Sequence, residues 1–249
     1  VSVADCFIRR GDWWNGSLSL PRIPGATFSG KVEQVSKKGG KLQRGDQVLS
    51  LVTSGGNSRY VCIPKDRLVK IPTIDSALAT CLPEVYLSAF QAIHYGQGSV
   101  QRYRKNALSG KKILVLGGVT PVGRAVIELG RDSGATVYAT SREKQYSWIA
   151  EAGGLPLSRD LNNWMHTVTL QIDLLIGIND VNSLHEDLTY DHLNALKPKG
   201  QLIVIGGPEE SGKFPSIGPG KGVCHTDIFK ILRRSLTYNV FEHWEKDMK

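Results

Sequence analysis

The chain has 249 residues, of which 41% are hydrophobic, 22% charged and 8% aromatic. At about 150 residues per domain, this length allows one large domain or two modest ones, and it is ample for a hydrophobic core. No apolar stretch approaches the roughly 18 residues that a membrane-spanning helix needs. The composition excludes a disordered, collagen-like or membrane-spanning chain and indicates a soluble globular protein.

Basic residues exceed acidic ones by 31 − 23 = +8, and the isoelectric point is about 9.3. Such a balance favours an anionic partner, which could be a phosphorylated cofactor, a nucleic acid or a membrane surface. Aromatic side chains do not interleave with the basic clusters, so we interpret them as a solvated face and expect no specific nucleic-acid partner. The clustered residues are Arg102, Arg104, Lys105, Lys111, Lys112, Lys230, Arg233 and Arg234.

The four cysteines, at positions 6, 62, 81 and 224, form no C-x-x-C pair. Neither a zinc finger nor a disulfide framework can be read from their spacing, so reduced thiols are expected. The sequence starts at Val1 and shows no signal peptide. We expect a cytoplasmic protein, with the mitochondrial or another organellar matrix as the alternative.

Short bursts of β-branched residues, separated by glycine-containing turns, fill the chain up to Pro83. They predict antiparallel strands at 31–35, 47–52 and 59–63. Turns are predicted between them at 39–40, 44–46 and 54–56. The first third is therefore a small β domain, which we place at residues 1–85.

From Ser76 onwards the apolar spacing becomes helical. A continuous apolar run at 111–118 then predicts a strand that is covered on both faces, and Pro121 suits the first turn of the helix that follows. Further strands are predicted at 135–140, 172–176 and 201–205. This alternation predicts right-handed crossovers and an α/β fold, with a doubly wound parallel sheet within residues 86–249.

The first of these strands runs into a glycine-rich loop, and ligands of such sheets bind outside the carboxyl ends of the strands. The loop is a degenerate G-x-G-x-x-G fingerprint with threonine in the middle glycine position, and it consists of Gly117, Gly118, Val119, Thr120, Pro121, Val122 and Gly123. We expect Gly118 to permit the tight turn and Gly123 to let the helix approach the strand. The helix N-terminus would attract a pyrophosphate, which lies further out or accepts a hydrogen bond from the Thr120 hydroxyl.

The second strand ends in Thr-Ser-Arg-Glu-Lys at 140–144. NAD-specific sites usually place an acidic residue on the ribose hydroxyls here, and none stands at this tip. Ser141 can donate a hydrogen bond, while Arg142 and Lys144 supply the positive charge that a 2′-phosphate requires. We therefore predict NADP(H), although Arg142 and Lys144 could also be ordinary solvated charges beside Glu143. The glycines after the two remaining strands complete the expected cofactor-binding set: Gly177, Gly206 and Gly207.

Several short motifs follow one another along the chain. They are D-x-x-x-R-x-G-x-W at 5–13, L-P-x-I-P-G at 20–25, G-x-V at 30–32, G-D-x-V at 45–48 and S-A-F-x-A at 88–92. Over nearly the whole chain they resemble the medium-chain dehydrogenase/reductase superfamily, especially its zinc-free quinone oxidoreductase and enoyl reductase branch. The resemblance implies a GroES-like β domain followed by a Rossmann domain. Against that family, we expect this chain to be incomplete at its N-terminus and to lack the final return to the first domain.

The same resemblance implies that no metal is bound. The positions that carry Cys, His-Glu and Cys ligands in the alcohol dehydrogenase branch hold Ser2, Ala26-Thr27 and Glu84 here, which is not a suitable set of zinc ligands. Hydride transfer from NADPH to a quinone or an α,β-unsaturated carbonyl is the reaction that this branch implies, in a homodimer.

The resemblance also implies the residues around the substrate. Trp13 and Trp14 would line the site, Ser88 and Tyr86 would lie near the cofactor, and Tyr86 is a candidate proton donor. Enoyl thioester reductases of this superfamily use a tyrosine where this chain has Trp13, and an indole N–H is not a useful acid. The segment 228–247 nevertheless resembles mitochondrial enoyl reductases, so an enoyl thioester reductase is one alternative. A non-catalytic relative that binds RNA or membranes through its basic surface is another.

Overall fold

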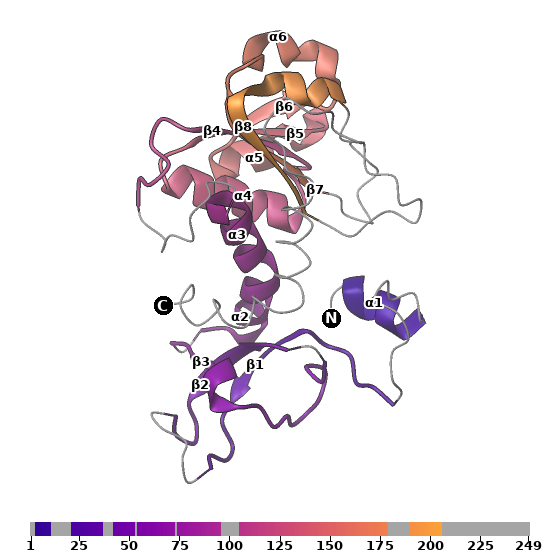
Figure 1. Ribbon diagram of the computed structural model, residues 1–249. Helices are drawn as coiled ribbons and strands as arrows, with labels where there is room; N and C mark the ends of the chain where they lie inside the picture. Colours follow the sequence, from indigo (N-terminus) through magenta and orange to yellow (C-terminus); the bar gives the residue numbers. More distant parts are fainter. Residues whose placement is uncertain are drawn as a thin grey trace. The chain divides into compact units, whose positions relative to one another are not determined.

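The computed structural model describes residues 3–10, 21–36, 42–52, 54–72, 74–95, 105–178 and 190–205. These residues belong to two compact units, which divide between Glu84 and Val85. The helices and strands of both units are labelled in Figure 1. None of the described helices is both long and apolar enough to cross a membrane.

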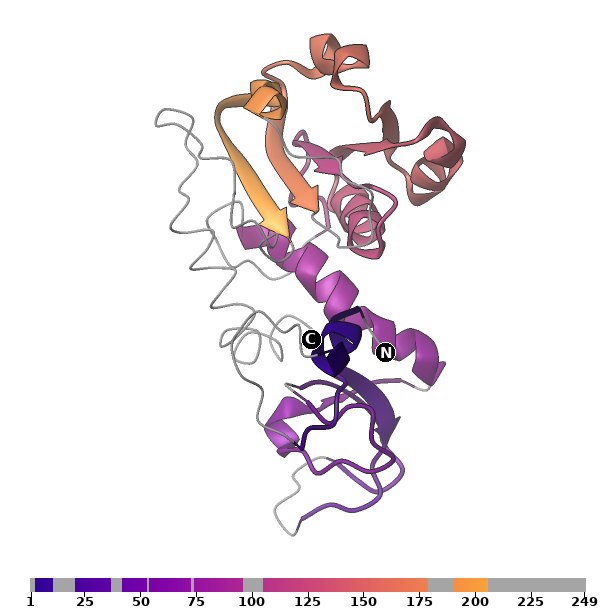
Figure 2. The same ribbon diagram turned by 90° about the vertical axis from the view of Figure 1, so that its right-hand side faces the viewer.

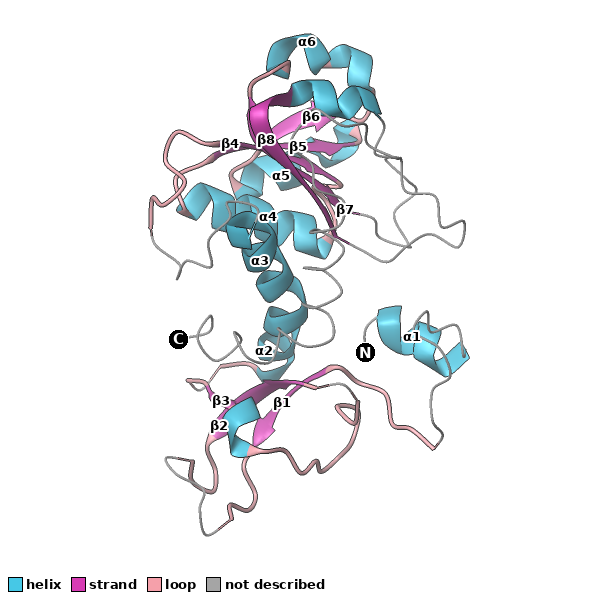
Figure 3. Ribbon diagram, in the orientation of Figure 1, coloured by secondary structure: helices cyan, strands magenta, loops and turns pink. Residues whose placement is uncertain are grey.

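The first unit contains a three-stranded antiparallel sheet, drawn in magenta in Figure 3. Its elements are α1 (Val3–Arg10), β1 (Thr27–Lys31), β2 (Gln47–Leu51), the 3-10 turn η1 (Lys65–Arg67), β3 (Val69–Lys70) and α2 (Ser76–Leu82). The central strand β2 pairs with β1 from Gln47 opposite Lys31 to Leu51 opposite Thr27, and β3 adds a short second partner. Leu49 of β2 is fully buried and anchors this sheet.

A tight turn at 43–46 leads into β2, where the G-D-x-V motif predicts a turn. Gly45 has a φ of +89°, which favours glycine because a Cβ atom is strained there. The carboxylate of Asp46 accepts a hydrogen bond from the Gln43 amide at 2.9 Å and pairs with Lys70 Nζ of β3 at 2.7 Å. The bond to Lys70 and the bond from Gln43 hold the pKa of Asp46 below its usual value.

Two strand predictions for this unit are corrected. The first strand covers Thr27–Lys31 rather than 31–35. Its pairing with β2 extends from Thr27 opposite Leu51 to Lys31 opposite Gln47, where β2 begins. The segment 59–63 forms no strand. Tyr60 there is 71% exposed, so the alternation of side chains has no buried face to fill. Without a partner strand, alternation alone does not produce a sheet.

The second unit is an α/β unit with a parallel sheet. Its elements are α3 (Ser88–Tyr95), β4 (Lys112–Leu116), α4 (Pro121–Asp132), β5 (Thr136–Ser141), η3 (Glu143–Gln145), α5 (Tyr146–Ala152), β6 (Leu155–Ser158), η4 (Leu161–Asn163), α6 (Met165–Val168), β7 (Ile172–Ile178), η5 (Tyr190–Ala195) and β8 (Leu196–Ile205). A single π-helical turn, η2 (Pro83–Leu87), precedes α3. The strand order is β6-β5-β4-β7-β8, and every neighbouring pair is parallel. Figure 2 shows β7 and β8 side by side with the same direction.

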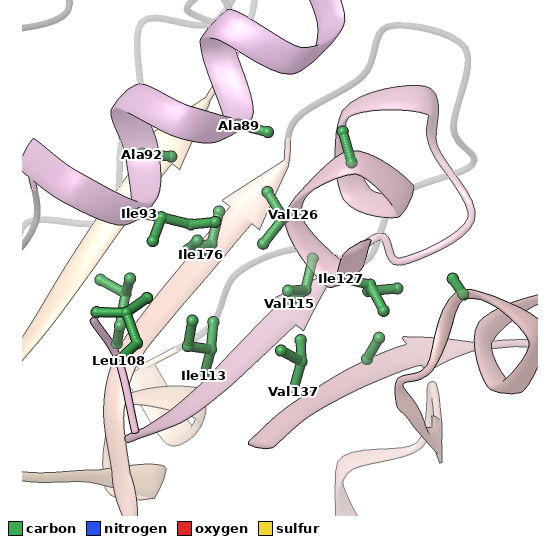
Figure 4. Close-up of a cluster of buried hydrophobic side chains, with 14 of the residues drawn as sticks. Ala89, Ala92, Ile93, Leu108, Ile113, Val115, Val126, Ile127, Val137 and Ile176 are labelled. Carbon is green, nitrogen blue, oxygen red and sulfur yellow. The ribbon is translucent and has the colours of Figure 1, made fainter. Parts of the chain in front are cut away.

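Side chains of β4 alternate between the two faces of this sheet. Ile113 and Val115 belong to the cluster of Figure 4, together with Val126 of α4. Leu114 and Leu116 belong to a second cluster, which includes α6 and η5. All four strand residues are at most 1% exposed, which explains the continuous apolar run of the sequence.

The predicted fold class, a doubly wound parallel sheet with a small antiparallel β domain, is confirmed, as are the strands now labelled β4, β5, β7 and β8. The sequence interpretation missed β6. This strand has only four residues and contains Pro156, which is tolerated because β6 is an edge strand among the described residues.

Candidate nucleotide-binding site

The strand β4 lies where the strand order of the parallel sheet reverses. From β4 the chain continues to β5 and β6 on one side and later to β7 and β8 on the other. Such a switch point opens a crevice at the carboxyl ends of the central strands, which is the usual ligand site of an open α/β sheet. Leu116, the last residue of β4, pairs with Gly177 of β7, so Gly177 lies at this edge.

The turn after β4 depends on Gly117, which has a φ of +89°. A Cβ atom on Gly118 would lie 2.6 Å from the Cβ atom of Ala139, so this glycine allows the loop to pack against β5. The prediction that Gly118 permits the turn is therefore corrected, because Gly117 makes the turn and Gly118 the close approach. A Cβ atom on Gly123 would collide with the Gly117 carbonyl oxygen, so helix α4 can approach the loop only with glycine at that position.

Thr120 is the N-cap of α4 and is only 6% exposed. Its hydroxyl oxygen accepts a hydrogen bond from the Gly123 amide at 3.0 Å and donates to the Gly117 carbonyl at 2.8 Å. Pro121 follows at the first helical position, where a missing N–H group costs nothing. Because the hydroxyl proton is engaged with Gly117, Thr120 does not offer the phosphate bond that the sequence suggested. Its function in this loop is to cap the helix.

Most backbone N–H groups of the loop 117–123 are bonded within the protein. Four of them donate to oxygen atoms of the loop or of Thr140: those of Gly117, Gly118, Thr120 and Gly123. Pro121 has no N–H group, so within this loop the N–H groups of Val119 and Val122 have no acceptor. Two such donors, at the N-terminus of a 12-residue helix, suit an anion and therefore fit the pyrophosphate of a dinucleotide.

The carboxyl end of β5 lies directly beside this loop, because the Gly118 amide donates to the Thr140 carbonyl at 3.2 Å. Ser141 is 1% exposed, and its hydroxyl donates to the Arg142 carbonyl at 3.2 Å, so its proton is also engaged. Arg142 and Lys144 are exposed, and neither forms an ion pair with a described residue. Glu143 is exposed between them. The tip therefore presents two cations that are free for an anionic ligand, and one acid.

Tyr86 lies in η2, and its hydroxyl donates a hydrogen bond to Glu128 of α4 at 2.5 Å. Arg124 Nε pairs with the same carboxylate at 2.9 Å. The hydrogen bond to Glu128, burial and the negative charge of Glu128 raise the pKa of Tyr86, and Arg124 opposes them. The phenol proton is thus held by α4, which makes Tyr86 a weaker acid than a free tyrosine. Ser88 is the first residue of α3 and is half-buried.

Several expected residues cannot be placed. Trp13, Gly206 and Gly207, like Ser2 and Trp14, lie outside the described residues. Throughout the described part of the chain, no three His, Cys, Asp or Glu side chains come together closely enough to hold a metal ion.

Sequence reasoning missed two residues that organise the site. Thr140 accepts a hydrogen bond from the Gly117 amide at 3.2 Å and donates to the Val115 carbonyl at 3.3 Å, so its side chain joins β5 to the start of the loop. The carboxylate of Glu128 accepts the hydrogen bond of the Tyr86 hydroxyl, although the two residues are 42 positions apart in the sequence. Only its i, i+4 spacing from Arg124 could be read in advance.

Comparison with known proteins agrees with this architecture. The model of the alcohol dehydrogenase GroES-like domain family matches residues 1–73. The chain is 31% identical over 205 residues to the quinone oxidoreductase-like protein 2 homolog of Nematostella vectensis. That similarity covers 80% of the chain and 53% of the relative, so the chain spans about half the length of this protein.

Two solved structures share the fold. The quinone oxidoreductase of Thermus thermophilus, which was also solved in complex with NADPH, superposes with a TM-score of 0.66 at 21% identity. It matches 97% of this chain and 72% of its own. The CurK enoyl reductase gives a TM-score of 0.67 at 20% identity, over 98% of this chain and 73% of its own.

The GroES-like match covers the region of the antiparallel sheet, and the solved structures share the fold over nearly the whole chain. The quinone oxidoreductase-like relative of Nematostella vectensis is similar in sequence over 80% of the chain. By these findings the chain is similar in fold and in sequence to the medium-chain dehydrogenase/reductase superfamily, and its similarity is to the quinone oxidoreductase and enoyl reductase-like branch.

Proposed function

We propose that the chain acts as an NADPH-dependent, zinc-independent oxidoreductase that reduces a quinone or an α,β-unsaturated carbonyl. The observation that carries this proposal is the pair of exposed cations Arg142 and Lys144, which form no ion pair with a described residue, beside the capped N-terminus of α4. In this proposal residues 1–85 form the substrate domain and residues 86–249 the nucleotide-binding domain of a homodimer. The similarity to quinone oxidoreductases supports the class of acceptor.

Each part of the loop has a separate task in cofactor binding. The Val119 and Val122 amides, with the partial positive charge of the α4 N-terminus, hold the pyrophosphate. Arg142 and Lys144 bind the 2′-phosphate. When NADPH is bound, its nicotinamide supplies the hydride, and the protein contributes mainly position and electrostatics.

After hydride transfer the product takes up a proton, and we propose that Tyr86 does not donate it. Because Glu128 holds the Tyr86 proton and raises the pKa of that phenol, Tyr86 is better suited to position α4 than to protonate a product. Ser88 and Trp13 are retained in this proposal as residues of the substrate site. A hydroquinone or an enolate can take its proton from water, so the reaction does not require a dedicated acid.

Fluorescence titration of the chain with NADPH and with NADH tests the cofactor. We expect saturable binding of NADPH at least tenfold tighter than of NADH, because the 2′-phosphate gains charge-assisted bonds of about 1.5 kcal/mol or more. The double variant Arg142→Met and Lys144→Met should remove this preference. The matched control is Lys31→Met, an exposed lysine on β1 in the other unit. Absence of NADPH binding by the unaltered chain would overturn the proposal.

A second function has its own support, because the chain also shares its fold with an enoyl reductase. Side-by-side assays with a quinone and with a crotonyl thioester, both at saturating NADPH, separate the two. Turnover of the quinone alone supports the proposal above, and turnover of the thioester alone replaces it with enoyl thioester reduction.

A further inference from the structure

We infer that Glu128 is a positioning residue that lowers the affinity of the chain for dinucleotides, because it holds Arg124 away from the end of α4 at which the pyrophosphate binds. This inference rests on the proposed function, since it needs an anion at that end. Arg124 is exposed on α4, and Glu128, one turn later, is half-buried. Both residues lie outside the glycine loop 117–123.

Arg124 is a cation near the positive end of its helix. It is the fourth residue of α4, and the first turn contains no acidic residue that would offset its charge. Because the N-terminal end of a helix carries a partial positive charge, an arginine there is unfavourable for the helix itself. In a chain that otherwise follows local preferences, a residue that breaks such a rule is expected at a functional site. An anion at the N-terminus of α4 would remove the conflict.

The side chain of Arg124 is long enough to meet such an anion. Each residue advances a helix by about 1.5 Å, so Arg124 lies only about 4.5 Å along the axis from Pro121, the first residue of α4. Helical side chains also lean towards the N-terminus of their helix. In the structure, however, Arg124 Nε donates to Glu128 Oε1 at 2.9 Å, and Glu128 lies one turn in the opposite direction. The carboxylate therefore draws the guanidinium away from the N-terminus.

Tyr86 fixes the carboxylate that holds Arg124. The Tyr86 hydroxyl donates to Glu128 Oε2 at 2.5 Å, whereas Arg124 bonds to Oε1, so each carboxylate oxygen has a separate partner. An exposed i, i+4 ion pair alone is weak, because two flexible side chains must be held in one geometry. Here Tyr86, which belongs to η2, already holds one of the two. The Glu128 side chain is 26% exposed, against 52% for Arg124. The pair is therefore firmer than its spacing on the helix alone would make it.

A pyrophosphate must then compete with Glu128 for Arg124. The guanidinium can form charge-assisted bonds with phosphate oxygens, but only after it leaves the carboxylate. When the binding-competent state is only fractionally populated, the apparent affinity is reduced by that fraction. Differences in affinity of this kind appear mainly in the dissociation rate. Glu128 thus keeps the cofactor exchangeable, which a reductase that releases its oxidised cofactor in every turnover requires.

Calorimetric titration of Glu128→Gln with NADPH and with NADH tests the inference. Glutamine keeps an acceptor for the Tyr86 hydroxyl but loses the charge that holds Arg124. We expect both dinucleotides, which share the pyrophosphate, to bind about fivefold tighter, corresponding to about 1 kcal/mol, with the ratio of their affinities unchanged. The dissociation rate of NADPH, measured by stopped-flow fluorescence, should decrease by a similar factor. Glu151→Gln, which removes an exposed acid of α5 in the same unit, is the matched control for net charge and should change neither quantity.

Further variants show whether the effect passes through Arg124. Arg124→Met alone should bind NADPH within about twofold of the unaltered chain, because a guanidinium held by Glu128 contributes little to binding. Arg124→Met combined with Glu128→Gln should lose the gain of the single variant. Tyr86→Phe, which loosens the same carboxylate, should tighten binding less than Glu128→Gln does. Should Glu128→Gln fail to fold, as judged by circular dichroism, Tyr86→Phe and Arg124→Met carry the test.

The outcomes separate this inference from the proposed function. If Glu128→Gln binds NADPH no more tightly than the unaltered chain, the inference is wrong and the proposed function stands. Retention of the gain in the double variant also overturns the inference, since the effect would then not pass through Arg124. If Arg124→Met alone weakens binding about tenfold, Arg124 already reaches the cofactor and Glu128 does not restrain it. Should the unaltered chain bind neither dinucleotide, the proposed function fails together with the inference.

Discussion

The two edges of the parallel sheet use their charged residues in opposite ways. At the amino edge, Asp173 of β7 accepts from the Lys112 amide at 2.9 Å, from Lys111 Nζ at 3.3 Å and from Lys197 Nζ at 2.8 Å. At the carboxyl edge, Arg142 and Lys144 have no ion-pair partner among the described residues. The charges around Asp173 therefore stabilise the sheet, whereas Arg142 and Lys144 are exposed and form no ion pair within the described part of the chain.

This difference shows that the basic residues behind the net charge serve two purposes: some are bonded within the sheet, and others are available to an anionic ligand. Lys111 and Lys112 contribute to the net charge that favours an anionic partner, and their cluster was expected to be a solvated face, yet the first is paired with Asp173 and the second bonds to Gln171 at 2.6 Å. Arg142 and Lys144 at the end of β5, by contrast, form no ion pair with any residue that the structure describes. Position on the sheet, rather than density of charge, identifies the binding edge.

Gly123→Ala should have the largest effect of any single substitution in the glycine loop or at the two edges. A Cβ atom at this position would collide with the backbone oxygen of Gly117, so the loop or the helix must move. We expect a loss of about 3 kcal/mol in the free energy of unfolding, measured by urea denaturation, and loss of NADPH binding. Gly30→Ala is the matched control, because a Cβ atom there meets nothing within 4 Å. Equal stability of the two variants would show that the loop is not tightly packed.

Asp173→Asn tests the amino edge. The carboxylate is 11% exposed and holds two lysines and one amide, but both lysines are partly exposed to water, so we expect a loss of about 2 kcal/mol in unfolding free energy. Nucleotide affinity should not change, because the opposite edge of the sheet binds it. Asp132→Asn, an exposed aspartate at the end of α4, is the control. A loss of NADPH binding with unchanged stability would reverse the assignment of the two edges.

The same variant has a defined pH dependence. Burial raises the pKa of Asp173, but the bonds from Lys197, the Lys112 amide and Lys111 outweigh it and lower the pKa below its ordinary value of 3.8. The folded state thus binds this proton less readily than the unfolded state, and the stabilisation is present above about pH 4 and lost as the pH falls through the folded-state pKa. The stability difference between the chain and Asp173→Asn should therefore shrink below pH 4.

Thr120→Val should cost about 1.5 kcal/mol in unfolding free energy. Valine keeps the shape of threonine but leaves the Gly123 amide and the Gly117 carbonyl without their bonds to the hydroxyl. Thr120→Ser, which keeps the hydroxyl, should recover most of this loss. If Thr120→Val instead kept full stability and lost only NADPH affinity, the hydroxyl would belong to the phosphate site and not to the helix cap.

The sequence was sufficient for the parts of the fold that depend on local patterns. The apolar run at 111–118 predicted β4 with its loop, because a strand that is buried on both faces has no polar alternation to break the pattern. Prediction from local patterns failed at β6, because Pro156 and the preceding glycines are typical of a loop. Missing β6 concealed the neighbourhood of Ser141 and Ser158, which only the register of the sheet reveals.

Site residues show the same division between local and long-range signals. The helix cap at Thr120 followed by Pro121 could be read from capping preferences alone, although the fingerprint made Thr120 resemble a phosphate ligand. The partner of Tyr86 could not be read, because Glu128 reaches it only when η2 and α4 are assembled. A proton donor inferred from resemblance thus becomes, in the structure, a link between two elements.

Arg142→Met should have the smallest effect on stability and so gives the sharpest test of the difference between the edges. Its side chain is exposed and has no ion-pair partner among the described residues, so the free energy of unfolding should change by less than about 0.5 kcal/mol. The stabilisation by added NADPH, measured as the increase in melting temperature, should decrease, because a weaker ligand stabilises the folded state less at the same concentration. Lys31→Met should leave both quantities unchanged. A destabilisation of more than about 1 kcal/mol without NADPH would show that Arg142, like the lysines around Asp173, is engaged in holding the sheet together.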